Sequence, residues 1–352
     1  MEAPIAERPT TRFDIASGRH NPIDVMGRRA AAPICGTTAN RLVRGLERRA
    51  RALARSLGLA SDASIRSLND DVKRMLGDIE TSLQPKDPGA SVGSVEFRVF
   101  SQFGEDGIIQ HLLRHADIQR DFFVEIGVED YRESNTRFLL QHNNWEGVII
   151  DSGDAHVTFL ERSMLRWRHS VDPVTAFVEP DGVNALLAAA RVPDAPGLLS
   201  IDIDGMDYWI LEELAVRPSI VVAEYNSHFG PTAAVSVPYS AGFERTRAHH
   251  SNLYFGASLT ALDHWARGQG YRLFGCTTGG NNAFFVRDDV AGDLPDRSPA
   301  EAYVRTRVRE AKDTARRLTY RVEEALRAPT FQSLPLIDVK TGEALTVRDV
   351  LA

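Results

Sequence analysis

The sequence predicts an α/β protein with a doubly wound, mostly parallel seven-stranded sheet, an antiparallel last strand and an N-terminal helical extension. Short apolar runs alternate with helical patterns along the middle of the chain, which is typical of a parallel sheet covered by helices on both faces. The run at 122–127 ends in an acid, one residue and a glycine, as a strand does where it opens a nucleotide-sized crevice. Two final apolar runs flank Gly-Gly-Asn-Asn at 279–282, which predicts a closing hairpin.

The α/β domain is predicted to span residues 93–297. A helix from 105 to about 115 precedes the opening strand, and the next helix starts near Phe138. Further strands are expected at 147–151, 174–179, 198–204 and 220–226. Helices are expected near 183–187, from about 208 to 214, and at 258–269, and the hairpin strands at 271–276 and 283–287. The irregular stretch at 227–257 is expected to be an insertion that covers the substrate.

Segments outside this domain are predicted from composition and spacing. Residues 1–40 lack periodicity and are expected to form a disordered or loosely packed arm. Residues 41–92 are predicted to be a helical hairpin and linker, because apolar residues recur at helical spacing at 42, 46, 53 and 57 and again at 65, 68, 72, 75, 79 and 83. Residues 298–352 are predicted to be a helical tail that contains a short apolar segment at 334–339 and a turn at Thr341-Gly342.

The N-terminal helical patterns leave two questions open. Their apolar stripe could form a dimerisation seam, and hence a homo-oligomer, or pack on the main domain. The arginines of the first pattern could contact an anionic polymer or membrane surface, or form a solvated helix face.

Composition narrows the classes of function. The 352 residues carry a net charge of -7, which disfavours a general nucleic-acid-binding surface. Two cysteines, Cys35 and Cys276, predict neither a disulfide framework nor a zinc site. No apolar stretch approaches the roughly 20 residues of a membrane span, and the amino terminus lacks the apolar core of a secretory signal, so a cytoplasmic protein is expected.

The predicted crevice favours one kind of nucleotide-like ligand. A pyrophosphate-binding turn needs three glycines, whereas Gly127 stands alone and is followed by Val128, Glu129 and Asp130. These carboxylates would repel a pyrophosphate but suit the sulfonium and ammonium groups of S-adenosylmethionine. Five parallel strands followed by a hairpin also suit a methyltransferase sheet better than a dehydrogenase sheet.

Residues from about 100 to 290 resemble a class I S-adenosylmethionine-dependent methyltransferase, close to the FkbM type. The matching pieces are Val-Glu-Ile-Gly at 124–127, Val-Ile-Ile-Asp at 148–151, Ser-Ile-Asp-Ile-Asp-Gly at 200–205 and Val-Ala-Glu at 222–224. The chain departs from the family where Glu129-Asp130-Tyr131 replaces the commoner second glycine. The resemblance implies S-adenosylmethionine as the cofactor and O-methylation of a sugar, polysaccharide or natural product, with a small molecule or glycan as partner.

The carboxyl ends of the predicted strands supply the cofactor-site residues. Glu125 and Gly127 are expected at the amino-acid end of the cofactor, and Asn135 near its carboxylate. Asp151 would accept hydrogen bonds from both ribose hydroxyls, because a carboxylate offers two acceptor oxygens. Glu179, or Asp181 just beyond it, is expected near the adenine. The alternative for each acid is a helix cap or a turn carboxylate.

Asp202, Asp204 and Glu224 end neighbouring strands and are expected to lie close together. Like charges in contact need a cation, shared protons or water. They could orient the cofactor ammonium and the substrate hydroxyls, with Asp202 serving the cofactor, or they could hold Mg²⁺ or another divalent cation. Asp204 could instead cap the helix after Gly205.

Histidines supply the predicted catalytic base. His228 follows the fifth strand, and His249 and His250 lie in the insertion. A histidine takes a proton near neutral pH, which transfer of a methyl group to a hydroxyl requires. Each histidine could instead be a packing or surface residue. Trp209, Tyr239 and Tyr254 could line an acceptor pocket, but are expected to pack in the core and the lid.

Two other functions compete with O-methyl transfer. One is a catalytically inactive, methyltransferase-like binding or assembly module, which the acidic turn at Glu129-Asp130 favours and Asp151 opposes. The other is chemistry on NAD or a nucleotide sugar, which the missing glycines disfavour.

Overall fold

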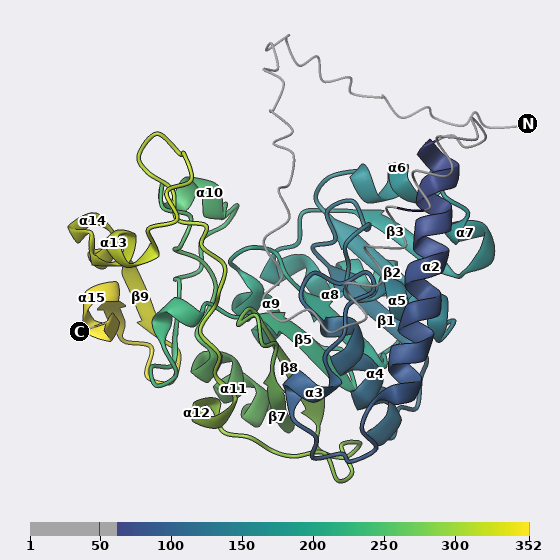
Figure 1. The fold of residues 1–352 in the computed structure, drawn as a ribbon. Helices are drawn as coiled ribbons and strands as arrows, with labels where there is room; N and C mark the ends of the chain where they lie inside the picture. The colour runs from purple at the N-terminus through teal and green to yellow at the C-terminus, as the bar shows by residue number, and fades with distance from the viewer. Residues whose placement is uncertain (1–48, 50–61, 352) are drawn as a thin grey trace, which may run out of the picture. The chain divides into compact units, whose positions relative to one another are not determined.

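The computed structural model describes residue 49 and residues 62–351, and within this part of the chain strand and helix alternate as predicted (Figure 1). The main sheet of the described residues has seven strands in the order β3-β2-β1-β4-β5-β8-β7. Its strands are β1 (Phe122–Ile126), β2 (Glu146–Asp151), β3 (Val171–Thr175), β4 (Leu198–Ile201), β5 (Ile220–Glu224), β7 (Tyr271–Cys276) and β8 (Asn282–Arg287). The first five pair in parallel, and β8 is antiparallel to both β5 and β7. The predicted fold class is therefore confirmed.

Helices cover both faces of this sheet because side chains alternate along each strand. Val124 and Ile126 of β1 pack with α8 (Pro180–Ala189), α9 (Asp207–Glu213) and α11 (Leu259–Gly268). Phe123 packs on the other face with α4 (Glu105–His115) and α5 (Arg137–His142). Shorter helices complete the domain: α3 (Val92–Val95), α6 (Ala155–Glu161), α7 (Leu165–Arg168) and α12 (Pro299–Ala302).

The third predicted strand was misplaced. Strand β3 ends at Thr175, and residues 176–179 follow it as a loop. Because β3 is the edge strand of the sheet, its side chains are less buried than those of the central strands, and Pro173 is tolerated there. The apolar signal at 174–178 therefore marked the end of the strand and the turn after it. Strands β4 and β5 likewise end at Ile201 and Glu224, so Asp202, Asp204 and Asn226 lie beyond them.

The segment after Ser298 is not the predicted helical tail. It contains an extended stretch, the short helices α13 (Val322–Arg327), α14 (Pro329–Gln332) and α15 (Val347–Leu351), and a hairpin of β9 (Pro335–Asp338) and β10 (Ala344–Thr346). Strand β9 also pairs with β6 (Val235–Ser236) of the insertion. The insertion further contains the 3₁₀ turn η1 (Ser227–Phe229) and α10 (Arg245–Ala248), and it shares a third apolar core with the C-terminal segment. Between residues 304 and 312, the backbone N–H groups of Val304, Thr306, Arg307 and Lys312 bond to other segments instead of forming helical turns.

The N-terminal extension is described from helix α2 (Asp62–Leu83) onward, and the predicted arm at 1–40 and first helical pattern at 41–57 lie outside the described residues except for residue 49. Helix α2 contacts the domain through a polar face, where Asp70 pairs with Arg137 and Asp78 with His142. Its apolar stripe is exposed at Leu68, Met75, Ile79 and Leu83. Most of this stripe therefore does not pack on the main domain, although Ile65 and Val72 are half-buried, and a homo-oligomer through it stays a prediction. None of the helices of the described residues is long and apolar enough to cross a bilayer.

Candidate functional site

The predicted site residues gather at the carboxyl edge of the sheet, where the strand order reverses between β1 and β4. In doubly wound folds, ligands bind in the crevice at this switch point. Gly127 follows β1, Asp202 follows β4, Asp151 ends β2 and Glu224 ends β5.

Gly127 is fixed by its contact with the neighbouring strand end. Its φ is 88°, and a Cβ at this position would lie 1.7 Å from the carbonyl oxygen of Asp202. Only glycine allows this approach and this φ without strain. The residue thus brings the ends of β1 and β4 together.

Glu125 is buried, and its carboxylate holds the loop that leads into α5. One oxygen accepts from the backbone N–H of Asn135 at 2.8 Å, and the other accepts from the side chains of Ser134 and Thr136 at 2.5 Å and from the Thr136 N–H at 3.1 Å. Asn135 donates its amide to Ser200 at 3.0 Å. Both residues therefore have protein partners, and Glu125 holds the end of the loop between β1 and α5 in place.

Asp151 is the last residue of β2 and is partly exposed. Its two carboxylate oxygens contact two different turns, one after β1 and one after β2. Oδ2 accepts from the Glu129 N–H and Oδ1 from the Gly153 N–H, both at 2.8 Å. Each carboxylate oxygen has a further lone pair, so the group can still receive two ligand hydroxyls. In the acidic turn itself, Asp130 is paired with Arg132 at 2.5 Å.

Glu179 and Asp181 flank the start of α8, beyond the loop after β3. Glu179 is the N-cap residue of α8 without a side-chain cap bond, and its carboxylate accepts from the Gly242 N–H of the insertion at 3.3 Å. The insertion therefore reaches the side of the crevice at which the adenine is expected.

Asp202, Asp204 and Glu224 come together as predicted, with one carboxylate oxygen of each within 4.8 Å of the others. Burial, and then repulsion from Asp204 and Asp207, raises the pKa of Asp202 well above its usual value. Burial, and then repulsion from Asp202, raises the pKa of Glu224 in the same way. Asp204 does not cap the helix after Gly205, because the N-cap residue of α9 is Met206 and no side chain caps it. Asp207 accepts from the Ile203 and Gly205 N–H groups and holds the loop before the helix.

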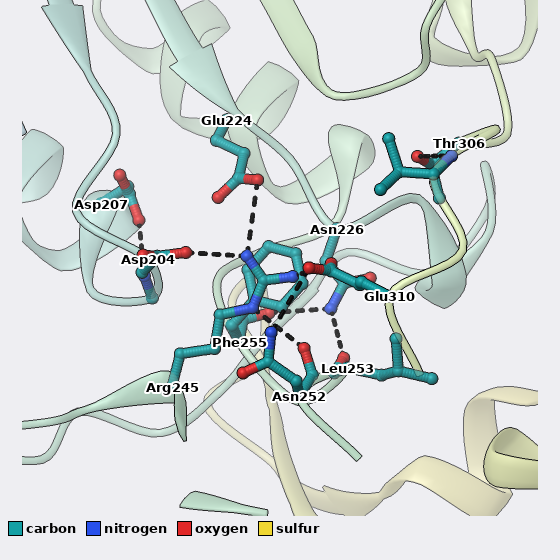
Figure 2. Close-up of polar contacts among 12 residues, drawn as sticks. Asp204, Asp207, Glu224, Asn226, Arg245, Asn252, Leu253, Phe255, Thr306 and Glu310 are labelled. Carbon is teal, nitrogen blue, oxygen red and sulfur yellow. Dashed lines mark hydrogen bonds and ion pairs between the residues drawn. The ribbon is translucent and has the colours of Figure 1, made fainter. Parts of the chain in front are cut away.

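A guanidinium that the sequence did not point to lies against this cluster (Figure 2). Arg245 of α10 has a side chain that is only 8% exposed, and it donates to Asp204 at 2.7 Å and to the Asn252 carbonyl at 2.9 Å. It also pairs with Glu310 and lies 3.9 Å from Glu224. Its charge lies 3.5 Å from the centre of the Phe255 ring. Arg245 is one of two arginines in the insertion, and no motif distinguishes it from Arg247.

The C-terminal segment brings Glu310 to the site by running along the edge of the sheet. Tyr225, just after β5, donates to the Val304 carbonyl at 2.6 Å, and the Thr306 N–H donates to Ser227 at 2.9 Å. Glu310 accepts from the Asn252 amide at 3.3 Å in addition to Arg245. The segment that the sequence analysis left outside the domain thus contributes to the cluster.

His228 and His249 differ in position, and neither has the pKa expected of a base near neutral pH. Burial, with the charges of Arg305 and Arg245, lowers the pKa of His228 to about 4. Burial, with the neighbouring His250, lowers that of His249 to about 4. His249 bonds to Ser251 and packs on His250 and Phe331, so its contacts lead toward the C-terminal helices and not to the carboxylates.

Trp209, Tyr254 and Tyr239 are placed as packing and rim residues. Trp209 donates to the Val237 carbonyl, Tyr254 donates to the Pro335 carbonyl, and Tyr239 is exposed. These bonds fasten the insertion to α9 and to β9.

Three buried polar atoms around Arg245 have no hydrogen-bond partner within the described residues. They are Oε2 of Glu224, Nδ1 of His228 and Oδ1 of Asn252. Buried polar atoms are normally paired, so unpaired ones need a water, an ion or a ligand. The site therefore offers hydrogen-bonding capacity that a bound molecule can use.

Neither a family model nor a curated protein matches the chain, and the FkbM-type resemblance stays a prediction. Solved structures match weakly. An O-methyltransferase family protein from Burkholderia thailandensis is 11% identical over 72% of this chain and 71% of that one, with a TM-score of 0.35. The N-terminal domain of EvdMO1, solved with SAH bound, is 10% identical over 61% and 94%, with a TM-score of 0.34.

NcsB1, an O-methyltransferase from neocarzinostatin biosynthesis in complex with S-adenosyl-L-homocysteine and 1,4-dihydroxy-2-naphthoic acid, is 17% identical. The match covers 52% of this chain and 57% of that one, with a TM-score of 0.30. Similarities of this size do not assign the chain to a family, so its function has to be argued from its own residues.

Proposed function

We propose that this chain is an S-adenosylmethionine-dependent O-methyltransferase that acts on a polyhydroxylated acceptor such as a sugar. The observation that carries the proposal is the convergence of Gly127, Asp151 and the Asp202–Glu224 pair on the switch point of the sheet. Asp151 has acceptor capacity left for the two ribose hydroxyls. The turn after Gly127 holds carboxylates where a dinucleotide would place its pyrophosphate, which favours the sulfonium cofactor.

Bound at this edge, the cofactor would supply an electrophilic methyl group, and the protein has to take the proton from the acceptor hydroxyl. We assign that role to the Asp202–Glu224 pair, because burial and then repulsion between neighbouring carboxylates raise the pKa of both groups, whereas burial lowers the pKa of His228 to about 4. The pair shares one proton, and the ionised carboxylate receives the second from the acceptor. Oε2 of Glu224 lacks a hydrogen-bond partner in the described structure and would be the atom that accepts this proton.

The acceptor class is argued from the three unpaired atoms around Arg245. Glu224, His228 and Asn252 each leave a buried polar atom without a partner among the residues described, and each atom can accept a hydrogen bond from a hydroxyl. A polyol satisfies several of them at once. A flat aromatic acceptor with a single reacting hydroxyl would leave the others unpaired, at about 1–3 kcal/mol for each group.

We further propose that the cluster needs no divalent cation. Asp202, Asp204 and Glu224 could supply oxygen ligands to Mg²⁺, but Arg245 already provides a cation at 2.7 Å from Asp204. A metal would have to displace this guanidinium. Methyl transfer should therefore persist after treatment with EDTA.

The test is transfer of tritium from methyl-labelled S-adenosylmethionine to a panel of free sugars, glycosides and phenols, preceded by thermal shifts with S-adenosylmethionine, S-adenosylhomocysteine and NAD. The proposal expects stabilisation by the two sulfur nucleosides, none by NAD, and label in the sugars or glycosides. Label confined to the phenols would overturn the acceptor class. Stabilisation by neither sulfur nucleoside would contradict the enzyme itself and favour a binding or assembly module.

A further inference from the structure

We propose that the site selects the charged form of its cofactor: S-adenosylmethionine binds more tightly than S-adenosylhomocysteine, and Glu310 sets this preference by holding Arg245 away from Glu224. The inference rests on the proposed function and concerns how the same site distinguishes cofactor from product. The two nucleosides differ in the methyl group and in the positive charge of the sulfonium.

The first argument is the charge around Glu224. Asp202, Asp204 and Asp207 all act on this carboxylate, and the guanidinium that opposes them is that of Arg245. Asp207 is buried, and burial, followed by repulsion from the neighbouring carboxylates, raises the pKa of both Asp202 and Glu224. A further cation that approaches this cluster is stabilised, whereas a neutral sulfur gains nothing from it.

The second argument is the way in which Arg245 divides its donors. An arginine commonly places both ends of its fork on a single carboxylate. Here Nη1 bonds to Asp204 at 2.7 Å and Nη2 to Glu310, while Glu224 remains 3.9 Å from Nη1. Figure 2 shows the guanidinium between these three carboxylates. Glu224 is therefore left without a hydrogen bond from Arg245, and its Oε2 has no partner among the residues described.

Glu310 is the residue that maintains this division. It comes from the C-terminal segment, its carboxylate is 31% exposed, and the Asn252 amide steadies it at 3.3 Å. If its charge were removed, Nη2 would be released and Arg245 could turn both ends of its fork onto Glu224. The negative charge facing the crevice would then fall.

A separate observation shows that a ligand is expected beside Arg245. His228 is 7% exposed, and its Nδ1 has no hydrogen-bond partner within the residues the structure describes. The charge of Arg245 acts on this ring and helps to lower its pKa. The carboxylates and the histidine thus belong to one binding region.

The position of the sulfonium follows from the chemistry of the proposed reaction. The acceptor oxygen has to contact both the transferred methyl group and the carboxylate that takes its proton. Only the methyl group and the acceptor oxygen would then lie between the sulfonium and the Glu224 carboxylate. Transfer of the methyl group removes the charge, so the same cluster that favours the cofactor favours release of the product.

The experiment is calorimetric titration of the full chain with S-adenosylmethionine, S-adenosylhomocysteine and sinefungin, in which an amine-bearing carbon replaces the sulfonium. For the unmodified chain we expect the two cationic ligands to bind about tenfold more tightly than S-adenosylhomocysteine. This is the size of the attraction expected between one ligand cation and the carboxylates of a partly buried site. Glu310→Gln should reduce this ratio about threefold or more, and Glu310→Asp should retain most of it. Glu324→Gln, which breaks an exposed pair with Arg321 in the same segment, is the matched control and should leave the ratio unchanged.

Asp204→Asn is a second variant in case Glu310→Gln does not fold, because the Asp204 side chain is 64% exposed. It removes one negative charge and should also lower the ratio. Equal binding of the three ligands, or a ratio that neither variant alters, would overturn the inference. If S-adenosylhomocysteine binds as tightly as the two cationic nucleosides, only the inference about charge selection fails. If none of the three nucleosides binds, the proposed function fails with it.

Discussion

Arg245 lies 2.7 Å from Asp204, and this ion pair fastens the insertion to the end of β4. The arginine side chain is 8% exposed, so its charge is compensated almost entirely by protein groups. Removing it leaves the half-buried Glu224 and Glu310 without their cation, whereas Asp204 is largely exposed. The fold of the site therefore depends on this one cation as much as on the strands beneath it.

Arg245→Met should lower the free energy of unfolding by about 1.5–3 kcal/mol, because it removes charged hydrogen bonds of a buried guanidinium and leaves Glu224 without its cation. Urea unfolding at neutral pH measures this. Arg247→Met on the same helix is the control, since the Arg247 pair with Glu244 is exposed and surface changes stay within about 0.5 kcal/mol. Equal effects of the two substitutions would contradict the role given to Arg245.

Gly127→Ala should destabilise the chain by about 3 kcal/mol or more, because the new Cβ meets the Asp202 carbonyl at 1.7 Å and φ is positive. Gly182→Ala is a matched control: it lies within α8, and its Cβ meets nothing within 4 Å. That change should be neutral or stabilise by up to about 1 kcal/mol, since alanine favours the helix. Thermal unfolding distinguishes the two, and a tolerated Gly127→Ala would refute the close approach of β1 and β4.

The Asp202–Glu224 pair predicts how stability changes with pH. The usual pKa of a glutamate carboxyl is 4.5, and burial followed by repulsion from Asp202 raises it in the folded chain. Between the two values the folded state holds more protons than the unfolded state, so the free energy of unfolding falls as pH rises through this window. Glu224→Gln removes this titrating group, so the free energy of unfolding of the variant should fall less as pH rises. Urea unfolding from about pH 5 to 8 measures it, and parallel curves for the two proteins would show that the pair does not share a proton.

His228 should remain neutral at physiological pH. Burial, together with the charges of Arg305 and Arg245, lowers its pKa to about 4, so its imidazole should titrate far below the usual value of about 6.5. NMR of the ring nitrogens as a function of pH measures this, with His228→Gln for assignment. Titration of His228 between pH 6 and 7 would restore it as the better base.

The central strands could be predicted from sequence because burial on both faces makes them continuous apolar runs. The runs at 122–126, 147–151 and 220–224 and the hairpin at 271–287 stand out for this reason, and the structure confirms them. Strand β3 was misplaced because an edge strand is only partly buried and its pattern is weak. Asp202, Asp204 and Glu224 could be predicted to meet, because parallel strands end at the same edge.

Arg245 and Glu310 could not be predicted in this way. Both lie in segments without periodicity, and their meeting depends on the tertiary path of the insertion and the C-terminal segment. Glu125 shows a different limit, since the sequence placed it at the cofactor but could not reveal that Ser134, Asn135 and Thr136 already use its carboxylate. An acid at a strand end in the sequence predicts where the crevice lies, but it does not predict whether the carboxylate contacts the ligand or the neighbouring loop.

The central claim is that the chain binds the cofactor nucleoside across β1, β2 and β4, with Asp151 at the ribose. The most direct measurement is the dissociation constant of S-adenosylhomocysteine for the unmodified chain, for Asp151→Asn and for the exposed control Asp154→Asn, by calorimetry. The account predicts binding that Asp151→Asn weakens about tenfold or more, since hydrogen bonds to a charged group contribute about 1.5–3 kcal/mol each, and that Asp154→Asn leaves unchanged. No binding to the unmodified chain, or equal affinities for all three proteins, would contradict it.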